Sequence, residues 1–195
     1  MLFYSCLFVF IRGFKLCFKN FQSLCLRVSV ANYQKRFMMK FAIGTTRAGL
    51  TLKKDVIAHL NKKGHEVDDL GMKIDGDFVP YHVSAANVAR AVSSGLYEKA
   101  VIICGTGAGS AIVANKFPGV YAVHCTNAFE GKRASAVNNA NVLVLAEWLT
   151  PGQHAAEIID AWLDTAFGEG FEPEWKEFLK NCFNEIQTME KDLLK

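Results

Sequence analysis

The stretch that decides the fold class is Val101-Ile102-Ile103-Cys104-Gly105-Thr106-Gly107-Ala108-Gly109-Ser110. Its apolar run is typical of a central strand in a parallel sheet, which is buried on both faces. Three glycines in five residues let backbone N–H groups turn toward a bound oxygen without a Cβ in the way. Ser110 to Lys116 then predicts the first turns of a helix, whose N-terminal end carries partial positive charge. The stretch therefore predicts a strand, an anion-binding loop and a helix.

Cys104 stands where this predicted strand ends and the glycine-rich loop begins. Open α/β sheets bind their ligands outside the carboxyl ends of the strands. A thiol beside positive backbone dipoles loses its proton more readily than a free thiol. The alternative is that Cys104 is a small buried hydrophobic residue, as many cysteines are.

The spacing of the glycines and of Lys116 disfavours two nucleotide-binding motifs. The glycines follow the pattern Gly-x-Gly-x-Gly after a strand that is not the first, and no acidic residue ends the next predicted strand, as a dinucleotide fingerprint requires. Lys116 lies too far along the chain for a phosphate-binding loop of the Walker type and is not followed by Ser or Thr.

The rest of the chain alternates between strand and helix patterns. This regular alternation with short connections predicts a parallel sheet of five strands between two layers of helices, an α/β fold of three αβα layers. The strands are predicted at 40–43, 66–70, 100–104, 120–124 and 141–146, and the helices around 52–60, 85–92, 110–116, 127–137, 151–167 and 174–194.

Charge and cysteine placement limit the function classes. Residues 1–37 hold six of the 22 basic side chains and no acidic one, so residues 38–195 carry 16 basic and 19 acidic side chains, a net charge of −3. A mildly acidic region of this kind lacks the basic surface that binds nucleic acid. Its cysteines, Cys104, Cys125 and Cys182, have no paired or zinc-binding spacing, which favours a reduced cytoplasmic protein without a metal.

The first 37 residues form a separate region by composition. Their longest apolar run, Leu2 to Ile11, is too short to span a bilayer and lacks the flanks of a signal peptide. We interpret residues 1–37 as a dispensable N-terminal extension, with an organellar transit peptide or a loose amphipathic tail as alternatives. Residues 38–195 are then the functional domain.

Four separated segments together resemble one family, that of ribose-5-phosphate isomerase type B and galactose-6-phosphate isomerase. The resemblance runs from about Lys40 to Phe167. Its strongest part is Ile103 to Gly109. It continues in Ala114-Asn115-Lys116-Phe117-Pro118-Gly119-Val120, in Asn138-Asn139-Ala140-Asn141-Val142-Leu143 and in Asp160-Ala161-Trp162-Leu163.

The resemblance implies a Rossmann-like sandwich, a homodimer with active sites between subunits, and interconversion of an aldose phosphate and a ketose phosphate without cofactor or metal. By position, Cys104 is the base that moves a proton through an enediolate, and Thr106 assists ring opening. Asn138 belongs to the substrate-binding set. The loop backbone at Gly105, Gly107, Ala108, Gly109 and Ser110 holds the developing negative oxygen, the electrostatic stabilisation that such a reaction needs.

Three departures from the family pattern predict a substrate other than ribose 5-phosphate. Thr45-Thr46-Arg47-Ala48-Gly49 stands where the family has Ser-Asp-His-Ala-Gly, Val137 replaces a histidine, and Gly170-Phe171-Glu172-Pro173 replaces a stretch that supplies an arginine. We expect Thr46 and Arg47 to bind the substrate's phosphate, since a guanidinium pairs two oxygens at once. His82 and His124 are the histidines expected nearest the cleft.

Two functions of other classes compete with the isomerase. A non-catalytic phosphosugar-binding or regulatory protein would explain the lost acid, histidine and arginine positions, although Cys104 and Thr106 are retained. A nucleotide-binding Rossmann protein is disfavoured by the glycine spacing.

Overall fold

The computed structural model describes residues 38–193, and within them five parallel strands form one sheet. The strand order is β2-β1-β3-β5-β4, so the strand that precedes the glycine loop, β3, is central. The predicted α/β fold is confirmed. The strands are β1 (Lys40–Thr45), β2 (Glu66–Asp69), β3 (Lys99–Cys104), β4 (Ala122–His124) and β5 (Val142–Ala146).

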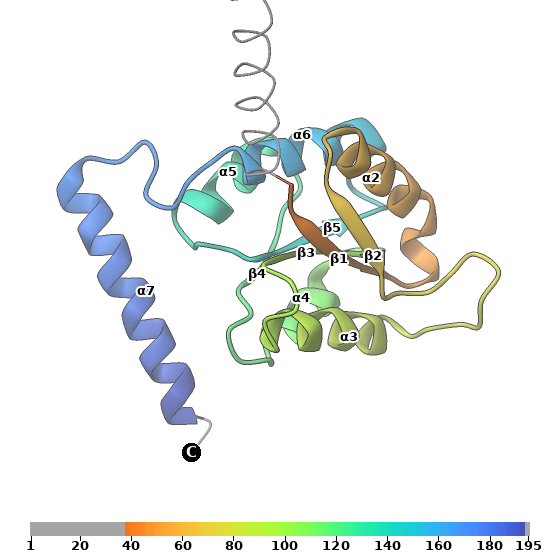
Figure 1. Ribbon diagram of the computed structural model, residues 1–195, viewed down its shortest axis with the longest axis horizontal. Coiled ribbons are helices and arrows are strands. Elements are labelled where there is room, and N and C mark those ends of the chain that lie inside the picture. The colour runs from red at the N-terminus through yellow and green to blue at the C-terminus, as the bar shows by residue number, and fades with distance from the viewer. Residues whose placement is uncertain (1–37, 194–195) are drawn as a thin grey trace, which may run out of the picture. The chain divides into compact units, whose positions relative to one another are not determined.

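Helices cover both faces of this sheet, as Figure 1 shows. Helices α2, α5 and α6 pack on one face and α3 and α4 on the other, and every residue of β5 is buried between the two layers. The bounds are η1 (Arg47–Gly49), α2 (Leu50–Lys62), α3 (Tyr81–Ser93), α4 (Ala108–Ala114), α5 (Ala128–Ala136), α6 (Gly152–Leu163) and α7 (Pro173–Leu193).

The fourth strand begins two residues later than the apolar pattern predicts. The backbone N–H groups of Tyr121 and Ala122 donate to the side chains of Asn141 and Asn115, each at 2.8 Å. Two asparagine side chains thus take the place of a neighbouring strand at this point.

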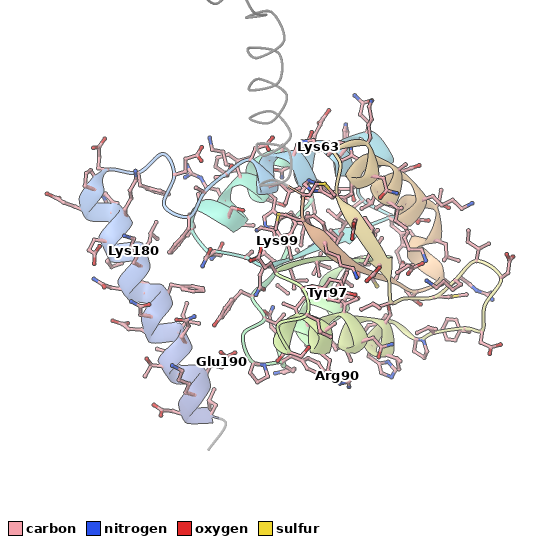
Figure 2. All side chains as sticks on the ribbon, in the orientation of Figure 1. Lys63, Arg90, Tyr97, Lys99, Lys180 and Glu190 are labelled. Carbon is pink, nitrogen blue, oxygen red and sulfur yellow. The ribbon has the colours of Figure 1, made fainter. Side chains whose placement is uncertain are left out.

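The last helix, α7, has no buried residue. It contacts the described body through Phe183, whose ring lies 4.7 Å from that of Tyr121 and 5.6 Å from that of Phe167. Glu190, labelled in Figure 2, accepts a 2.8 Å hydrogen bond from the backbone N–H of Gly119. None of the helices in the described part of the chain is long and apolar enough to cross a membrane.

The first 37 residues, predicted to be a dispensable extension, lie outside the described residues.

Candidate active site

The carboxyl ends of all five strands meet at one edge of the sheet, since all pairings are parallel. At this edge β1 and β3 lie side by side. The helix that follows β1 covers one face of the sheet, and the helix that follows β3 covers the other. Because the chain leaves β1 and β3 toward opposite faces, a crevice opens between the ends of these two strands. This crevice is the usual ligand position in open α/β sheets. Cys104 ends β3 beside this crevice and is half-buried.

Three aromatic rings pack against the glycine loop that follows Cys104. A Cβ at Gly105 would lie 3.0 Å from the indole of Trp148, and one at Gly109 would lie 2.8 Å from the ring of Tyr81. At Gly107, where φ is +77°, a Cβ would come within 2.3 Å of the imidazole of His124. The glycines are therefore needed for close packing as well as for backbone conformation.

Hydrogen bonds fix the loop to the segment after β5. The backbone N–H of Glu147 donates to the carbonyl of Cys104 at 2.9 Å, and that of Trp148 donates to Gly105 at 3.1 Å. The carboxylate of Glu147 also accepts a 2.9 Å bond from the backbone N–H of Leu52 in α2. The loop is thus held in one conformation before any ligand binds, the preorganisation that electrostatic stabilisation requires.

The last residue of β1, which precedes the turn, is bonded through its side chain to the strand that carries Cys104. Thr45 donates from its hydroxyl to the carbonyl of Ile103 at 2.9 Å, and a Cβ at Gly49 would lie 3.1 Å from that same oxygen. Arg47, in the same turn, is exposed. The hydroxyl of Thr46 is buried and donates to the carbonyl of Val79 at 2.8 Å, so this side chain holds the loop before α3.

The other predicted loop residues differ in exposure. Thr106 and Ala108 are exposed, Gly107 is buried, and the Ser110 hydroxyl is buried without a hydrogen-bond partner among the described residues. His82 is exposed, and its ring lies 5.5 Å from that of Tyr81, the residue that contacts Gly109. His82 is therefore close to the loop.

His124 ends β4 at the same edge and Cys125 follows it, but the two residues differ in environment. Cys125 is 0 % exposed in the core, and burial raises the pKa of its thiol to about 12. The ring of His124 packs on Gly107, and burial lowers the pKa of its imidazole, although Glu130 opposes this shift. Its Nε2 atom is buried and has no hydrogen-bond partner in the described part of the chain.

Asn138 is the one predicted site residue that the structure does not bring to the loop within one chain. It follows α5, which begins after β4 and returns to the amino edge of the sheet. There it lines a groove together with Leu179, Cys182 and Phe183 of α7. Asn138 and Cys104 thus belong to opposite edges of the same sheet.

The sequence interpretation missed Trp148, Tyr81 and Glu147. All three lie far from the loop in sequence. Trp148 and Glu147 reach it only through the register of β3 against β5, which pairs Cys104 with Ala146. The sequence did carry a signal for these residues. Glu147 and Trp148 come just after the predicted strand at 141–146, and Tyr81 lies just before the predicted helix around 85–92. In residues 38–193, no group of three or more His, Cys, Asp or Glu is arranged to hold a metal ion.

Comparison with known proteins identifies the family. Residues 41–176 match the Ribose/Galactose Isomerase family. The chain is 38 % identical over 156 residues to 4-deoxy-4-sulfo-D-erythrose isomerase of Clostridium sp. (strain MSTE9), covering 80 % of this chain and 98 % of that protein. It is 36 % identical to D-erythrulose-4-phosphate isomerase of Pectobacterium atrosepticum, covering 68 % of this chain and 88 % of that protein.

Among solved structures, ribose-5-phosphate isomerase B of Clostridium thermocellum superposes with a TM-score of 0.71. The two chains are 35 % identical, and the match covers 80 % of this chain and 99 % of that one. Sequence family, overall fold and nearly full coverage of the relatives agree. The chain therefore belongs to the ribose/galactose isomerase family and is a sugar isomerase.

Proposed function

We propose that the protein interconverts an aldose and a ketose that carry a terminal phosphate or a similar anion, with Cys104 as the base. The observation that carries the proposal is the half-buried thiol of Cys104 at the mouth of a preorganised glycine loop. Cys125, the other thiol at this edge, is unsuited to proton transfer, because its pKa is about 12 and it is fully buried.

The proposed reaction is an isomerisation through an enediolate. The Cys104 thiolate removes the proton on C2 of the aldose, and the electron pair moves onto the C1 carbonyl oxygen to give an enediolate. Return of that proton to C1, with transfer of the hydroxyl proton from O2 to O1, gives the ketose. The backbone N–H groups from Gly105 to Ser110 stabilise the negative oxygen, and Thr106, exposed beside them, assists opening of a cyclic substrate.

Arg47 is the proposed anion-binding residue. It lies two residues after Thr45, whose hydroxyl bonds Ile103, the neighbour of Cys104, and it is exposed at the crevice edge of the sheet. Thr46 supports the turn after β1 through its bond to Val79, and His82 lies at the α3 side of the loop. The named relatives act on sugars of four and five carbons that end in a phosphate or a sulfonate. We therefore propose a substrate of this size.

A homodimer in the cytoplasm, with each site shared between two copies, completes the proposal. Helix α7 leaves Trp175, Phe178 and Met189 between 53 % and 60 % exposed, which is an apolar surface suited to a second copy. Asn138 reaches a glycine loop only if a second chain presents it. Light scattering at micromolar concentration should give twice the chain mass, and a monomer mass would contradict the dimer.

The test of the isomerase is turnover of a panel of tetrose, pentose and hexose phosphates and a four-carbon sugar sulfonate. On the substrate found, Cys104→Ser should lower kcat about 10²-fold or more, the usual contribution of a general base, with unchanged unfolding. Cys182→Ser, on α7, is the matched control and should retain activity. Near-normal turnover by Cys104→Ser would remove Cys104 as the base.

Two further measurements test the intermediate and the anion site. In D2O, an enediolate allows solvent deuterium to enter the product at the carbon that receives the proton, whereas a direct hydride shift does not. Arg47→Ala should raise KM for the phosphorylated sugar much more than for its unphosphorylated counterpart. Equal effects on both sugars would exclude a phosphate contact by Arg47.

A further inference from the structure

His124 has a buried polar atom that no described residue satisfies. Its imidazole packs directly on Gly107, where an added Cβ would lie 2.6 Å from Nε2. This Nε2 atom is inaccessible to solvent and has no hydrogen-bond partner among residues 38–193. Leaving a buried donor or acceptor unpaired is unfavourable, so about nine tenths or more of such groups are paired in native proteins. The missing partner is a group that residues 38–193 do not supply.

The position of His124 relative to Cys104 identifies where that partner lies. In the sheet, His124 pairs with Val144 of β5, and Cys104 pairs with Ala146 of the same strand. The imidazole and the thiol therefore approach the glycine loop from two strands on either side of β5. Arg47 follows β1, on the far side of β3 from β4. The crevice edge thus carries a cation at one end, the thiol in the middle and the imidazole at the other end.

The chemistry of a neutral imidazole limits what it binds. Burial lowers the pKa of His124, so at pH 7 the ring is uncharged and carries one N–H donor and one acceptor. An uncharged group of this kind suits a hydroxyl or carbonyl oxygen, whereas the terminal anion is better matched by the guanidinium of Arg47. A neutral histidine with a lowered pKa is an established proton donor in enediolate chemistry.

We propose that His124 contacts the oxygens on C1 and C2 of the substrate through Nε2 and carries the hydroxyl proton between them. This role rests on the proposed isomerase function. As the C2–H bond breaks, the N–H of His124 gives its proton to O1, where negative charge develops. The ring nitrogen then takes the proton of the O2 hydroxyl as the C2 carbonyl forms. The imidazole ends the cycle in its starting state, and no other reactant is consumed.

The first test is direct contact in the wild-type protein. The probe is a four-carbon phosphorylated aldonohydroxamate, whose planar pair of oxygens imitates an enediolate. In protein labelled with ¹⁵N-histidine, saturation with the probe should shift the Nε2 resonance of His124, assigned by its loss in His124→Gln. The resonances of His154, exposed on α6, should not move. An unshifted His124 signal at saturation would overturn the proposal, and this measurement requires no variant to be active.

The second test uses substitutions with matched controls. His124→Leu removes the donor and should lower kcat about 10²-fold, the lower end of general acid–base contributions, with a much smaller change in KM. It should weaken the hydroxamate at least tenfold, the effect of about 1.4 kcal/mol, while inhibition by inorganic phosphate stays unchanged. His124→Gln keeps an N–H donor and should recover part of the loss in binding, and His154→Gln should behave as wild type.

The outcomes separate this proposal from the function on which it rests. If the wild type isomerises a sugar of the panel and His124→Leu retains kcat within about twofold, the role of His124 is wrong and the isomerase stands. If kcat falls but His124→Leu binds hydroxamate and inorganic phosphate as wild type does, the contact with O1 and O2 is wrong. If the wild type converts no sugar, the proposed function fails and this role fails with it.

Discussion

At the scale of single residues, the site depends on what lies against each glycine. The pattern around Cys104 was enough to predict a strand, a loop and a helix, since apolar runs and glycine spacing are local signals. The rings of Trp148, His124 and Tyr81 on the three glycines were not predictable, because each contact joins positions 17 to 43 residues apart that meet only in the folded chain. The same reason explains why the missing partner of His124 Nε2 is visible only in the folded chain.

Lys99, labelled in Figure 2, is a half-buried residue at the opposite edge of the sheet from the site. Its ammonium lies 4.2 Å from the centre of the Trp162 ring, and burial lowers its pKa from 10.5 to about 8. The folded protein therefore binds fewer protons than the unfolded chain between pH 8 and about 10, so stability attributable to Lys99 rises with pH in that range.

Lys99→Met tests this sign. Below pH 8 the charged lysine opposes folding by up to about 3 kcal/mol, an upper limit since the Trp162 ring favours the cation. The variant should therefore match or exceed the wild type in free energy of unfolding at pH 7, and should lose that advantage by about pH 10. Urea unfolding at a series of pH values measures the difference. Lys54→Met, at an exposed position on α2, is the control and should show no such trend. A variant that gains relative stability as pH rises would contradict the prediction.

At the scale of elements, the alternation of strands and helices was predicted correctly because each element carries its own periodicity. The start of β4 differed because side chains from elsewhere set it, where Asn115 and Asn141 bond the backbone before the strand. The surplus of apolar residues on α7 was visible in the pattern. Its apolar residues recur at helical spacing, but only Phe183 and a few neighbours use that face within the chain.

Gly131 lies where α5 packs closely on α6. A Cβ there would lie 2.6 Å from the carbonyl oxygen of Ile158 and 3.1 Å from its Cγ2. Alanine stabilises a helix relative to glycine by about 0.5–1 kcal/mol. Overpacking costs about 1–3 kcal/mol, and here the atom that the new methyl group meets belongs to the backbone and cannot rotate aside.

Gly131→Ala should therefore be net destabilising by about 1–2 kcal/mol in chemical denaturation. Lys132→Ala, at an exposed position on the same helix, should stay within about 0.5 kcal/mol of the wild type. Greater stability of Gly131→Ala would show that the two helices separate at low cost, and that their contact does not fix the position of β4 and its histidine.

At the scale of the whole molecule, the proposed active site draws on both edges of the sheet. Cys104, His124 and Arg47 gather at one edge, while Asn138 and the exposed apolar side chains of α7 lie elsewhere. The sequence could not distinguish a residue that serves its own chain from one that the proposed dimer would present to a second copy, because both kinds fit the same periodicity.

We expect the fold to form without residues 1–37. Within residues 38–193, the first contacts are made by Met39, whose carbonyl accepts a 3.0 Å hydrogen bond from the backbone N–H of Glu66 and whose own N–H donates to His65. Phe41 follows in the core, 0 % exposed and edge-on to Trp162. A chain that starts at Met38 should therefore retain its melting temperature within about 2 °C, which for a domain of this size is under 1 kcal/mol, and its kcat/KM. A chain that starts at Ala42 loses both contacts and should melt far lower or fail to fold. The pair of truncations locates the boundary of the domain, and a large fall in melting temperature on removal of residues 1–37 alone would show that the extension stabilises the isomerase.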